Sequence, residues 1–292
     1  MRYLLAIWIS RLASFLSRIT GKGQGSSLPG MVAQKIYPSI LAKMGKQIAG
    51  PIVAVTGTNG KTTTNNMIKA MLDKSGFKTV SNINGANMLT GIITAFLYSC
   101  NWRGRISSNA ACLEVDEATF PLLLKSIKPD WLVVTNFFRD QLDRYGELET
   151  TVGFVANSLQ YLSKTRLILN ADDPLSAQIG HKCSLPVYYY GLGRHQGVSL
   201  TTSAARETKY CPFCGSELEY EYFHYSQLGQ YRCPQGDFER PQPDLEGLEP
   251  IVGQREVSCF LRFSQNETAE TLYLPLDGSY NSYNGLSDVL SG

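Results

Sequence analysis

Short hydrophobic runs alternate with amphipathic ones along the chain from residue 50 onward. The apolar, β-branched runs that predict strands are Ile52–Thr56, Ala110–Val115, Trp131–Thr135 and Arg166–Asn170. The runs that predict the intervening helices are Thr62–Leu72, Glu117–Ile127 and Asp140–Leu162. Because apolar strands that alternate with helices form parallel sheets covered on both faces, we predict an α/β domain with a parallel sheet over residues 50–292.

Residues 3–19 show a different pattern, with apolar side chains at helical spacing. Arg11, Ser14 and Arg18 fall on one face, and the apolar stripe on another consists of Leu5, Trp8, Ile9, Leu12, Phe15, Leu16 and Ile19. Two alternatives are open for this stripe: it docks on the protein's own body or on a partner, or it lies on a membrane surface. Arg11 and Arg18 leave no apolar run long enough to span a bilayer, and no cleavage pattern of a signal peptide follows.

The stretch Gly21–Gly30 is rich in Gly and Ser and contains Lys22, which is typical of a mobile connector or of a loop that approaches an anion. Residues 1–49 are therefore interpreted as an N-terminal amphipathic helix and a linker.

Charge and cysteine content narrow the class of protein. The 27 basic and 25 acidic residues leave a net charge of +2, which excludes a general nucleic-acid binder. Seven cysteines, an odd number in a long chain without an export signal, indicate reduced thiols and a cytoplasmic location.

The first predicted strand leads into a glycine-containing loop and then into a helix. The loop reads Gly57-Thr58-Asn59-Gly60-Lys61-Thr62-Thr63. Glycines let backbone N–H groups converge on phosphate oxygens, the helix N-terminus attracts negative charge, Lys61 supplies a cation, and Thr62 can hold Mg²⁺. The loop therefore predicts a site for ATP and Mg²⁺.

Val55 stands where the commonest phosphate loop has its first glycine, so the loop is a variant. This variant resembles the phosphate loop of the Mur ligase family. Glu114, in the acidic segment Leu113–Glu117, matches the family glutamate that takes part in Mg²⁺ binding, so the resemblance implies catalytic roles for Lys61 and Glu114.

Three later segments resemble the same family in the same order. Thr135-Asn136 is followed by Asp140-Gln141-Leu142-Asp143, with Gln141 at the position of a family histidine that assists a second metal ion. An amide is a weaker cation ligand, so a second Mg²⁺ site does not follow from the resemblance. Asp140–Glu147 and Asn84–Met88 are similar to the MurT branch of the family.

Asn170–Pro174 resembles the family segment after the next strand. Gly278–Asn284 resembles the nucleotide-side motif, which implies that Asn281 and Asn284 contact the nucleotide, with Asn284 at the adenine. Taken alone, such an asparagine-rich segment is more often a turn.

A cysteine-rich insertion is predicted at about residues 205–245. Cys211, Cys214 and Cys233 have the spacing of three ligands of a zinc ribbon, and the expected fourth position is Gly236. Zinc therefore needs another donor, for which the alternatives are Asp237, His224, Cys259 or water. We expect a structural zinc site rather than a catalytic one.

The resemblance implies an ATP-dependent enzyme that amidates the D-glutamate α-carboxylate of lipid II in peptidoglycan synthesis, at the inner face of the membrane. It implies a GatD-type glutaminase as the partner that supplies ammonia, and a C-terminal Mur ligase domain that this chain lacks. Two alternatives stay open: another Mur-type amide ligase, and a non-catalytic module that binds nucleotide and a partner.

Overall fold

The computed structural model describes residues 1–19, 27–82, 86–138, 147–201, 208–264, 266–276 and 278–291. The chain forms two compact units, and each combines strands with helices that pack on them. The first unit contains residues 1–56, 61–132 and 157–165, and the second contains residues 57–60, 133–156 and 166–292.

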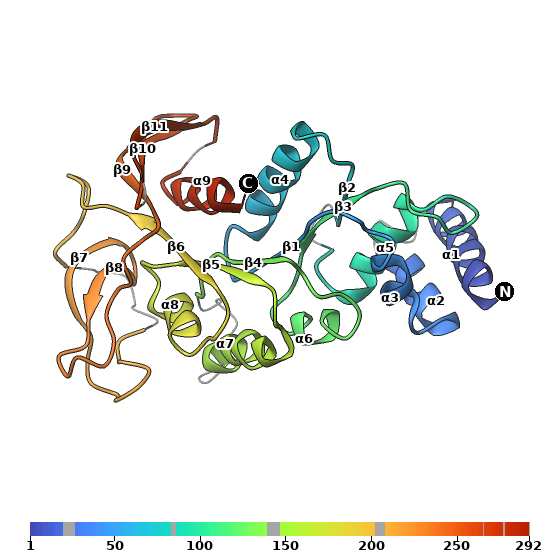
Figure 1. The fold of residues 1–292 in the computed structure, drawn as a ribbon, viewed down its shortest axis with the longest axis horizontal. Coiled ribbons are helices and arrows are strands. Elements are labelled where there is room, and N and C mark those ends of the chain that lie inside the picture. Colours follow the sequence, from blue (N-terminus) through green and yellow to red (C-terminus); the bar gives the residue numbers. More distant parts are fainter. Residues whose placement is uncertain are drawn as a thin grey trace. The chain divides into compact units, whose positions relative to one another are not determined.

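The first unit holds the N-terminal helices and three parallel strands. Its elements are α1 (Arg2–Ile19), α2 (Leu28–Ile36), α3 (Ile40–Gly45), β1 (Ile52–Thr56), α4 (Lys61–Lys74), β2 (Thr79–Ser81), α5 (Leu89–Ser99), β3 (Ala110–Glu114), α6 (Phe120–Leu123) and the 3₁₀ helix Leu159–Tyr161. Strand β3 lies between β1 and β2 and pairs with both in parallel. Helix α4 packs on all three strands, and α5 packs on β2, α2 and α3 (Figure 1).

Strands β1 and β3 are buried along their whole length, which is why both read as unbroken apolar runs. Their register places Ile52 opposite Ala111 and Val55 opposite Glu114. Both strands therefore end at the same edge of the sheet. In open α/β sheets this carboxyl edge is where ligands bind.

The second unit contains the remaining strands, most of the helix Glu147–Ser158, and two complete helices that lie on opposite sides of its sheet (Figure 1). Its elements are β5 (Arg166–Asn170), α8 (Pro174–His181), β6 (Val187–Leu192), β7 (Glu219–Tyr225), β8 (Leu228–Arg232), β9 (Leu245–Val252), β10 (Val257–Phe263), β11 (Asn266–Leu274) and α9 (Tyr280–Ser291). The chain passes between the two units within β4 (Trp131–Val134) and within α7 (Glu147–Ser158).

The sheet of the second unit follows the order β4, β5, β6, β9, β10, β11. Strands β5, β6 and β9 are parallel, whereas β9, β10 and β11 form antiparallel pairs. Helix α8 packs on β5, and α9 packs on β5, β6 and β9 to β11. Strands β7 and β8 form a separate antiparallel hairpin within the predicted cysteine-rich insertion.

The α/β fold and its parallel strands are confirmed, but two local predictions are wrong. The helix predicted at Glu117–Ile127 is only one turn, Phe120–Leu123, with Pro121 in that turn, where the missing N–H of proline is tolerated. The segment Gly278–Asn284 is not merely a turn, because Tyr280 begins the twelve-residue helix α9. Residues 140–146 lie outside the described part, so the start of the helix predicted from Asp140 is not tested.

Helix α1 is present as predicted, and its apolar stripe is exposed in the described part of the chain. Its buried side chains are Tyr3, Ala6, Ile7, Ser10, Ser14 and Ser17. They recur at helical spacing on the side opposite the stripe. No helix in the described residues combines the length and hydropathy needed to cross a bilayer.

Candidate functional site

The loop after β1 has a backbone that requires glycine at two positions. Gly57 and Gly60 have φ angles of +119° and +83°, which L side chains rarely adopt. A Cβ atom on Gly57 would lie 2.4 Å from Thr135 Oγ1, and one on Gly60 would lie 2.3 Å from Asn284 Oδ1. Both the conformation and the close packing therefore exclude larger residues here.

The segment after β4 holds this loop in place. The Asn136 side chain accepts from the Asn59 amide at 3.0 Å and donates to the Asn59 carbonyl at 3.2 Å. The Thr58 amide donates to the Asn136 carbonyl at 2.7 Å, and the Thr58 hydroxyl accepts from the Phe138 amide at 3.0 Å. These bonds hold the loop in place through its backbone and the Thr58 hydroxyl.

Asp173 supports the same segment from α8. It caps α8 by accepting from the Leu175 amide, and its other oxygen accepts from the Phe137 amide at 2.9 Å. Burial raises the pKa of Asp173 to about 7, although the backbone hydrogen bonds favour the charged form.

In the first unit, the start of α4 carries two side chains that are bonded to acidic residues at the end of β3 and directly after it. Lys61 Nζ lies 3.2 Å from Glu117 Oε1, and both side chains are largely buried. The Thr62 hydroxyl donates to Glu114 Oε2 at 2.9 Å. Lys61 is therefore held as a cation beside a carboxylate, and Thr62 and Glu114 present oxygen atoms to each other.

Two asparagines fix the position of Glu114, which is buried. Asn82 bonds the backbone of Glu114 in both directions, at 2.9 Å to its amide and 2.6 Å to its carbonyl. Asn87 donates to Glu114 Oε1 at 3.3 Å. A carboxylate and a hydroxyl 2.9 Å apart are the hard oxygen donors that Mg²⁺ prefers, so this pair fits a magnesium ion.

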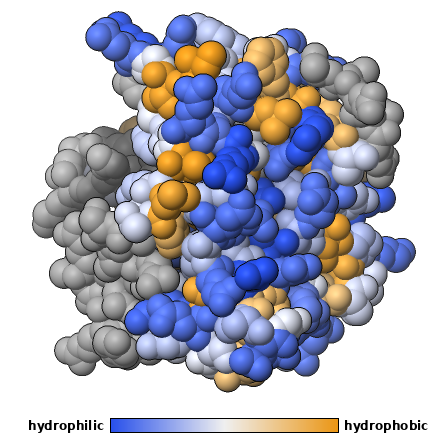
Figure 2. Space-filling view, turned by 90° about the vertical axis from the view of Figure 1, so that its left-hand side faces the viewer, coloured by the Kyte–Doolittle hydropathy of each residue, from blue (hydrophilic) through white to orange (hydrophobic). Residues whose placement is uncertain are grey.

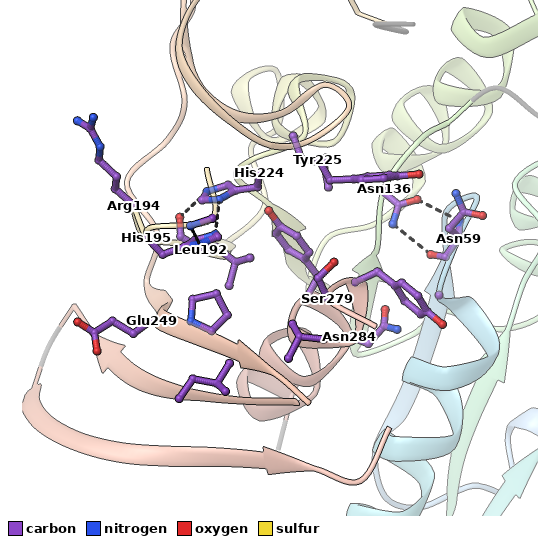
Figure 3. Close-up of a pocket in the computed structure, with 18 of the residues that line it drawn as sticks. Asn59, Asn136, Leu192, Arg194, His195, His224, Tyr225, Glu249, Ser279 and Asn284 are labelled. Atoms are coloured by element: carbon purple, nitrogen blue, oxygen red, sulfur yellow. Dashed lines mark hydrogen bonds between the residues drawn. The ribbon is translucent and has the colours of Figure 1, made fainter. Parts of the chain in front are cut away.

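The second unit contains a cavity of about 1200 Å³ that Asn59 and Gly60 help to line. Figure 3 shows Asn59, Asn136 and Asn284 at one end of this cavity and the two histidines His195 and His224 at the other. Asn284 comes from α9 and donates to Asn281 at 2.9 Å, so these two predicted residues act as one buried pair.

The hydrogen-bond partners of the two histidines determine which ring nitrogen carries the proton. A carbonyl can only accept, so His224 Nε2 donates to the Leu192 carbonyl at 3.0 Å. His224 Nδ1 then accepts from His195 Nε2 at 3.1 Å, and His195 Nδ1 accepts from the Gly197 amide at 3.1 Å. Burial lowers the pKa of both histidines, which favours their neutral forms.

A buried ion pair lies behind the histidine end of the cavity. Arg240 Nε donates to Asp172 at 2.6 Å, and Asp172 also accepts from the Leu192 amide and from the Tyr283 hydroxyl, each at 2.8 Å. His224 Nε2 is 3.7 Å from the same carboxylate. The hydrogen bonds join Arg240, β6 and α9 to Asp172 and so give the cavity wall a defined shape.

The chain is similar to known proteins in sequence and in fold. Residues 55–232, more than half of the chain, match the Mur ligase middle domain. The chain belongs to the Mur ligase family. It is 38% identical over 98% of its length to the lipid II isoglutaminyl synthase (glutamine-hydrolyzing) subunit MurT of Staphylococcus aureus (strain COL), and 34% identical over 94% to that of Streptococcus pneumoniae (strain ATCC BAA-255 / R6).

The chain spans only about three fifths of these relatives, 62% and 58% of their respective lengths. Among solved structures, it is similar to a pseudomurein peptide ligase type C from Methanothermus fervidus, with a TM-score of 0.64 and 27% identity. That match covers 84% of this chain and 46% of the other.

The second unit carries a cysteine cluster. Cys211, Cys214, Cys233 and Asp237 place one ligand atom each within 4.8 Å of one another. The fourth member is Asp237, one of the predicted alternatives, whereas His224 lines the cavity and Cys259 lies in β10. Gly236, the position expected from the spacing, has a φ of +79°, which disfavours a cysteine there.

The hairpin β7–β8 brings Cys233 back to Cys211 and Cys214, and the sulfur atoms of Cys214 and Cys233 are 3.4 Å apart. Tetrahedral zinc with Zn–S bonds of about 2.3 Å would place its sulfur ligands about 3.8 Å apart, so the cluster could hold such an ion.

The structure brings together some predicted residues and adds others. Thr62 meets Glu114, and Asn281 meets Asn284. Thr63 is half-buried, and no role for it follows from the described contacts. Gln141 lies outside the described residues.

Several residues of the site escaped prediction: Asn82, Asn87 and Glu117 around the acidic segment, and His195, His224, Asp172 and Arg240 around the cavity. Asn87, Glu117 and Asp172 stood inside quoted segments but without a role, and His224 was named only as an alternative zinc donor. The two histidines are far apart in sequence and belong to no motif, so no sequence signal could have paired them.

Proposed function

We propose that this chain binds ATP and Mg²⁺ through Gly57–Thr63. Backbone N–H groups of the loop contact the phosphates, Lys61 neutralises their charge, and Thr62 and Glu114 hold Mg²⁺. When bound, Mg²⁺ supplies charge stabilisation to the transferred phosphoryl group. The observation that carries the proposal is the bonded pair Thr62–Glu114 at the end of a loop that only glycines can form.

We further propose that the bound nucleotide extends from the loop along the cavity of the second unit. Asn284 lies against Gly60 and is fixed by Asn281, so its amide is placed beside the loop. Nucleobases are recognised by such fixed amides because an amide offers both a donor and an acceptor.

The reaction that we propose is the amidation of the D-glutamate α-carboxylate of lipid II, because the relatives at 34–38% identity are named as subunits of lipid II isoglutaminyl synthase. A carboxylate oxygen attacks the γ-phosphorus of ATP, and ADP leaves. Ammonia then attacks the acyl phosphate, loses a proton and displaces phosphate. Lys61 stabilises the charge of the transferred group in the first step.

The ammonia comes from glutamine through a GatD-type glutaminase partner, in keeping with the words "glutamine-hydrolyzing" and "subunit" in the relatives' names. All seven cysteines are free thiols, which supports the proposed cytoplasmic location.

The test is an amidation assay on the full-length protein with lipid II, ATP, Mg²⁺, glutamine and the glutaminase, followed by mass spectrometry of the stem peptide. We expect isoglutamine and an equal amount of ADP. Ammonium chloride in place of glutamine and glutaminase should give the same product, because it bypasses the partner. ATP consumption that depends on a free amino acid instead of ammonia would overturn the proposed reaction in favour of an amino-acid-adding ligase.

We also propose that Cys211, Cys214, Cys233 and Asp237 hold one structural zinc ion. Three thiolates and one carboxylate form a closed set of four ligands, as structural zinc sites require. Such an ion would cross-link the Cys211–Cys214 turn to the end of β8 and stabilise the hairpin.

A further inference from the structure

Helix α1 exposes its apolar face, although it packs firmly on the first unit. Six large apolar side chains are between 41% and 61% exposed: Leu5, Trp8, Ile9, Leu12, Phe15 and Leu16. Burial of large apolar side chains stabilises a fold, so a helix that buries serines and exposes this stripe is not oriented for its own unit. We name these six residues the α1 stripe.

Polar bonds hold α1 in this orientation. The Tyr3 hydroxyl donates to the Gly104 carbonyl at 2.7 Å, and Trp8 Nε1 donates to the Trp102 carbonyl at 2.8 Å. Arg11 donates to the carbonyls of Cys100 and Leu97. The exposure of the α1 stripe is therefore built into the contacts of the helix.

Aromatic side chains of the neighbouring segment extend the α1 stripe. Trp102 is 61% exposed, and the Arg103 guanidinium lies over its ring at 4.9 Å. Tyr98 is half exposed, and its hydroxyl is 2.8 Å from the hydroxyl of Ser14, on the buried side of α1. Tryptophan, tyrosine and arginine together are typical of the boundary between lipid head groups and acyl chains.

The charge around the α1 stripe has one sign. Residues 1–49 contain seven basic residues and no acidic residue, whereas residues 50–292 contain 20 basic and 25 acidic ones. Arg2, Lys35 and Lys43 are exposed. A surface of this kind repels a second copy of itself and attracts an anionic one.

The second unit offers a contrast. On the face that Figure 2 shows, hydrophobic residues form small groups separated by hydrophilic ones. Dispersed apolar residues are normal for a soluble surface, whereas a contiguous helical stripe marks a contact.

We propose that the α1 stripe is an interfacial anchor that lies in the head-group region of an anionic lipid bilayer. The apolar side chains enter the acyl boundary, Trp8 and Trp102 lie at head-group level, and Arg2 and Lys35 contact lipid phosphates. This inference rests on α1 and its neighbours and does not depend on nucleotide binding or amidation.

The test is co-sedimentation of the full chain with vesicles of equimolar phosphatidylglycerol and phosphatidylcholine, and with vesicles of phosphatidylcholine alone. We expect binding to the anionic vesicles that weakens with added salt, and about tenfold weaker binding to the neutral ones. The double variant Leu12→Glu/Phe15→Glu should bind anionic vesicles at least about tenfold more weakly.

The matched control is Leu122→Glu/Tyr161→Glu, which adds the same charges at apolar side chains of the same unit that are 44% and 64% exposed. We expect it to retain most of the vesicle binding. Arg2→Gln/Lys35→Gln changes no buried side chain and should weaken binding to anionic vesicles alone, which keeps the test valid if the glutamate variant unfolds.

Equal loss of binding in the control and stripe variants would overturn the proposal. So would equal binding to both kinds of vesicle. Concentration-dependent dimerisation that Leu12→Glu/Phe15→Glu abolishes, without vesicle binding, would assign the α1 stripe to a second copy of the chain instead.

Discussion

The phosphate loop and the cysteine cluster differ in how the chain brings their ligand-binding groups together. The loop takes its groups from seven consecutive residues, Gly57–Thr63, whose backbone is set by two glycines. The cluster takes its groups from residues 211–237, with a β-hairpin between Cys214 and Cys233. A site made of consecutive residues can be predicted from its sequence. In a site made of separated residues, the identity of the last ligand depends on the fold of the segment between them.

The largest expected effect is a loss of zinc affinity in the cysteine cluster, because each substitution there removes one of four ligands. Cys214→Ser should lower zinc affinity by about two orders of magnitude or more, and Asp237→Ala by about ten- to a hundredfold. Asp237→Cys should hold zinc at least as tightly as the wild type. Metal analysis and competition with a chelator measure all three.

Cys183→Ser provides the control, because Cys183 is a free thiol outside the cluster. If Asp237→Ala and Cys183→Ser retain equal amounts of zinc, the fourth ligand is not Asp237. Absence of zinc from the freshly purified wild type would contradict the whole assignment.

The loop should respond to a change of shape more than to a change of chemistry. Gly60→Ala adds a methyl group at φ +83° that meets the buried Asn284, so we expect a loss of about 2–3 kcal/mol in unfolding free energy. Gly76→Ala is a matched control, because Gly76 has a similar φ of +90° and no atom within 4 Å of the added Cβ. Chemical denaturation should show a loss of only about 1–2 kcal/mol there. Equal losses would mean that the contact with Asn284 is not tight.

A smaller effect on stability is expected in α9, the helix whose Asn284 lies against Gly60. Burial raises the pKa of Asp288 to about 7, and Asp288 Oδ1 has no hydrogen-bond partner in the described residues. Because the folded-state pKa lies above the ordinary value, protonation of Asp288 stabilises the folded state at low pH. This stabilisation is lost as the pH rises through about 7. The stabilisation by Asp288→Asn relative to the wild type should therefore grow between about pH 4 and pH 7, and be about 1–3 kcal/mol larger at pH 8 than at pH 5.

Thermal unfolding at the two pH values measures that difference. A stabilisation by Asp288→Asn that is the same at pH 5 and pH 8 would show that the carboxyl does not titrate with folding.

The elements that could be predicted from the sequence are those set by local patterns, and those that could not are set by packing between distant segments. Strands Ile52–Thr56 and Arg166–Asn170 were predicted with their observed bounds, because buried parallel strands are short apolar runs that end at turns. Helix α9 was not predicted, because its first turns contain serine, asparagine and glycine, which favour turns when considered alone. Packing on β5, β6 and β9 outweighs that preference.

The candidate site shows the same limit. Lys61, Thr62 and Glu114 could be named from motifs, but their partners Glu117, Asn82 and Asn87 could not be assigned from spacing. The orientation of α1 was also undecided, because an amphipathic pattern shows that a helix has two faces and not which face is covered.

The measurement that tests the central claim most directly is isothermal titration calorimetry of ATP with Mg²⁺ on the wild type, Lys61→Ala and Lys69→Ala. Lys61 belongs to the loop, whereas Lys69 lies on the same helix α4 in an exposed pair with Asp73. We predict about a ten- to hundredfold weaker affinity for Lys61→Ala, because a phosphate loses a charge-assisted partner, and an unchanged affinity for Lys69→Ala. Wild-type affinity in a folded Lys61→Ala protein would contradict the assignment of nucleotide binding to this loop.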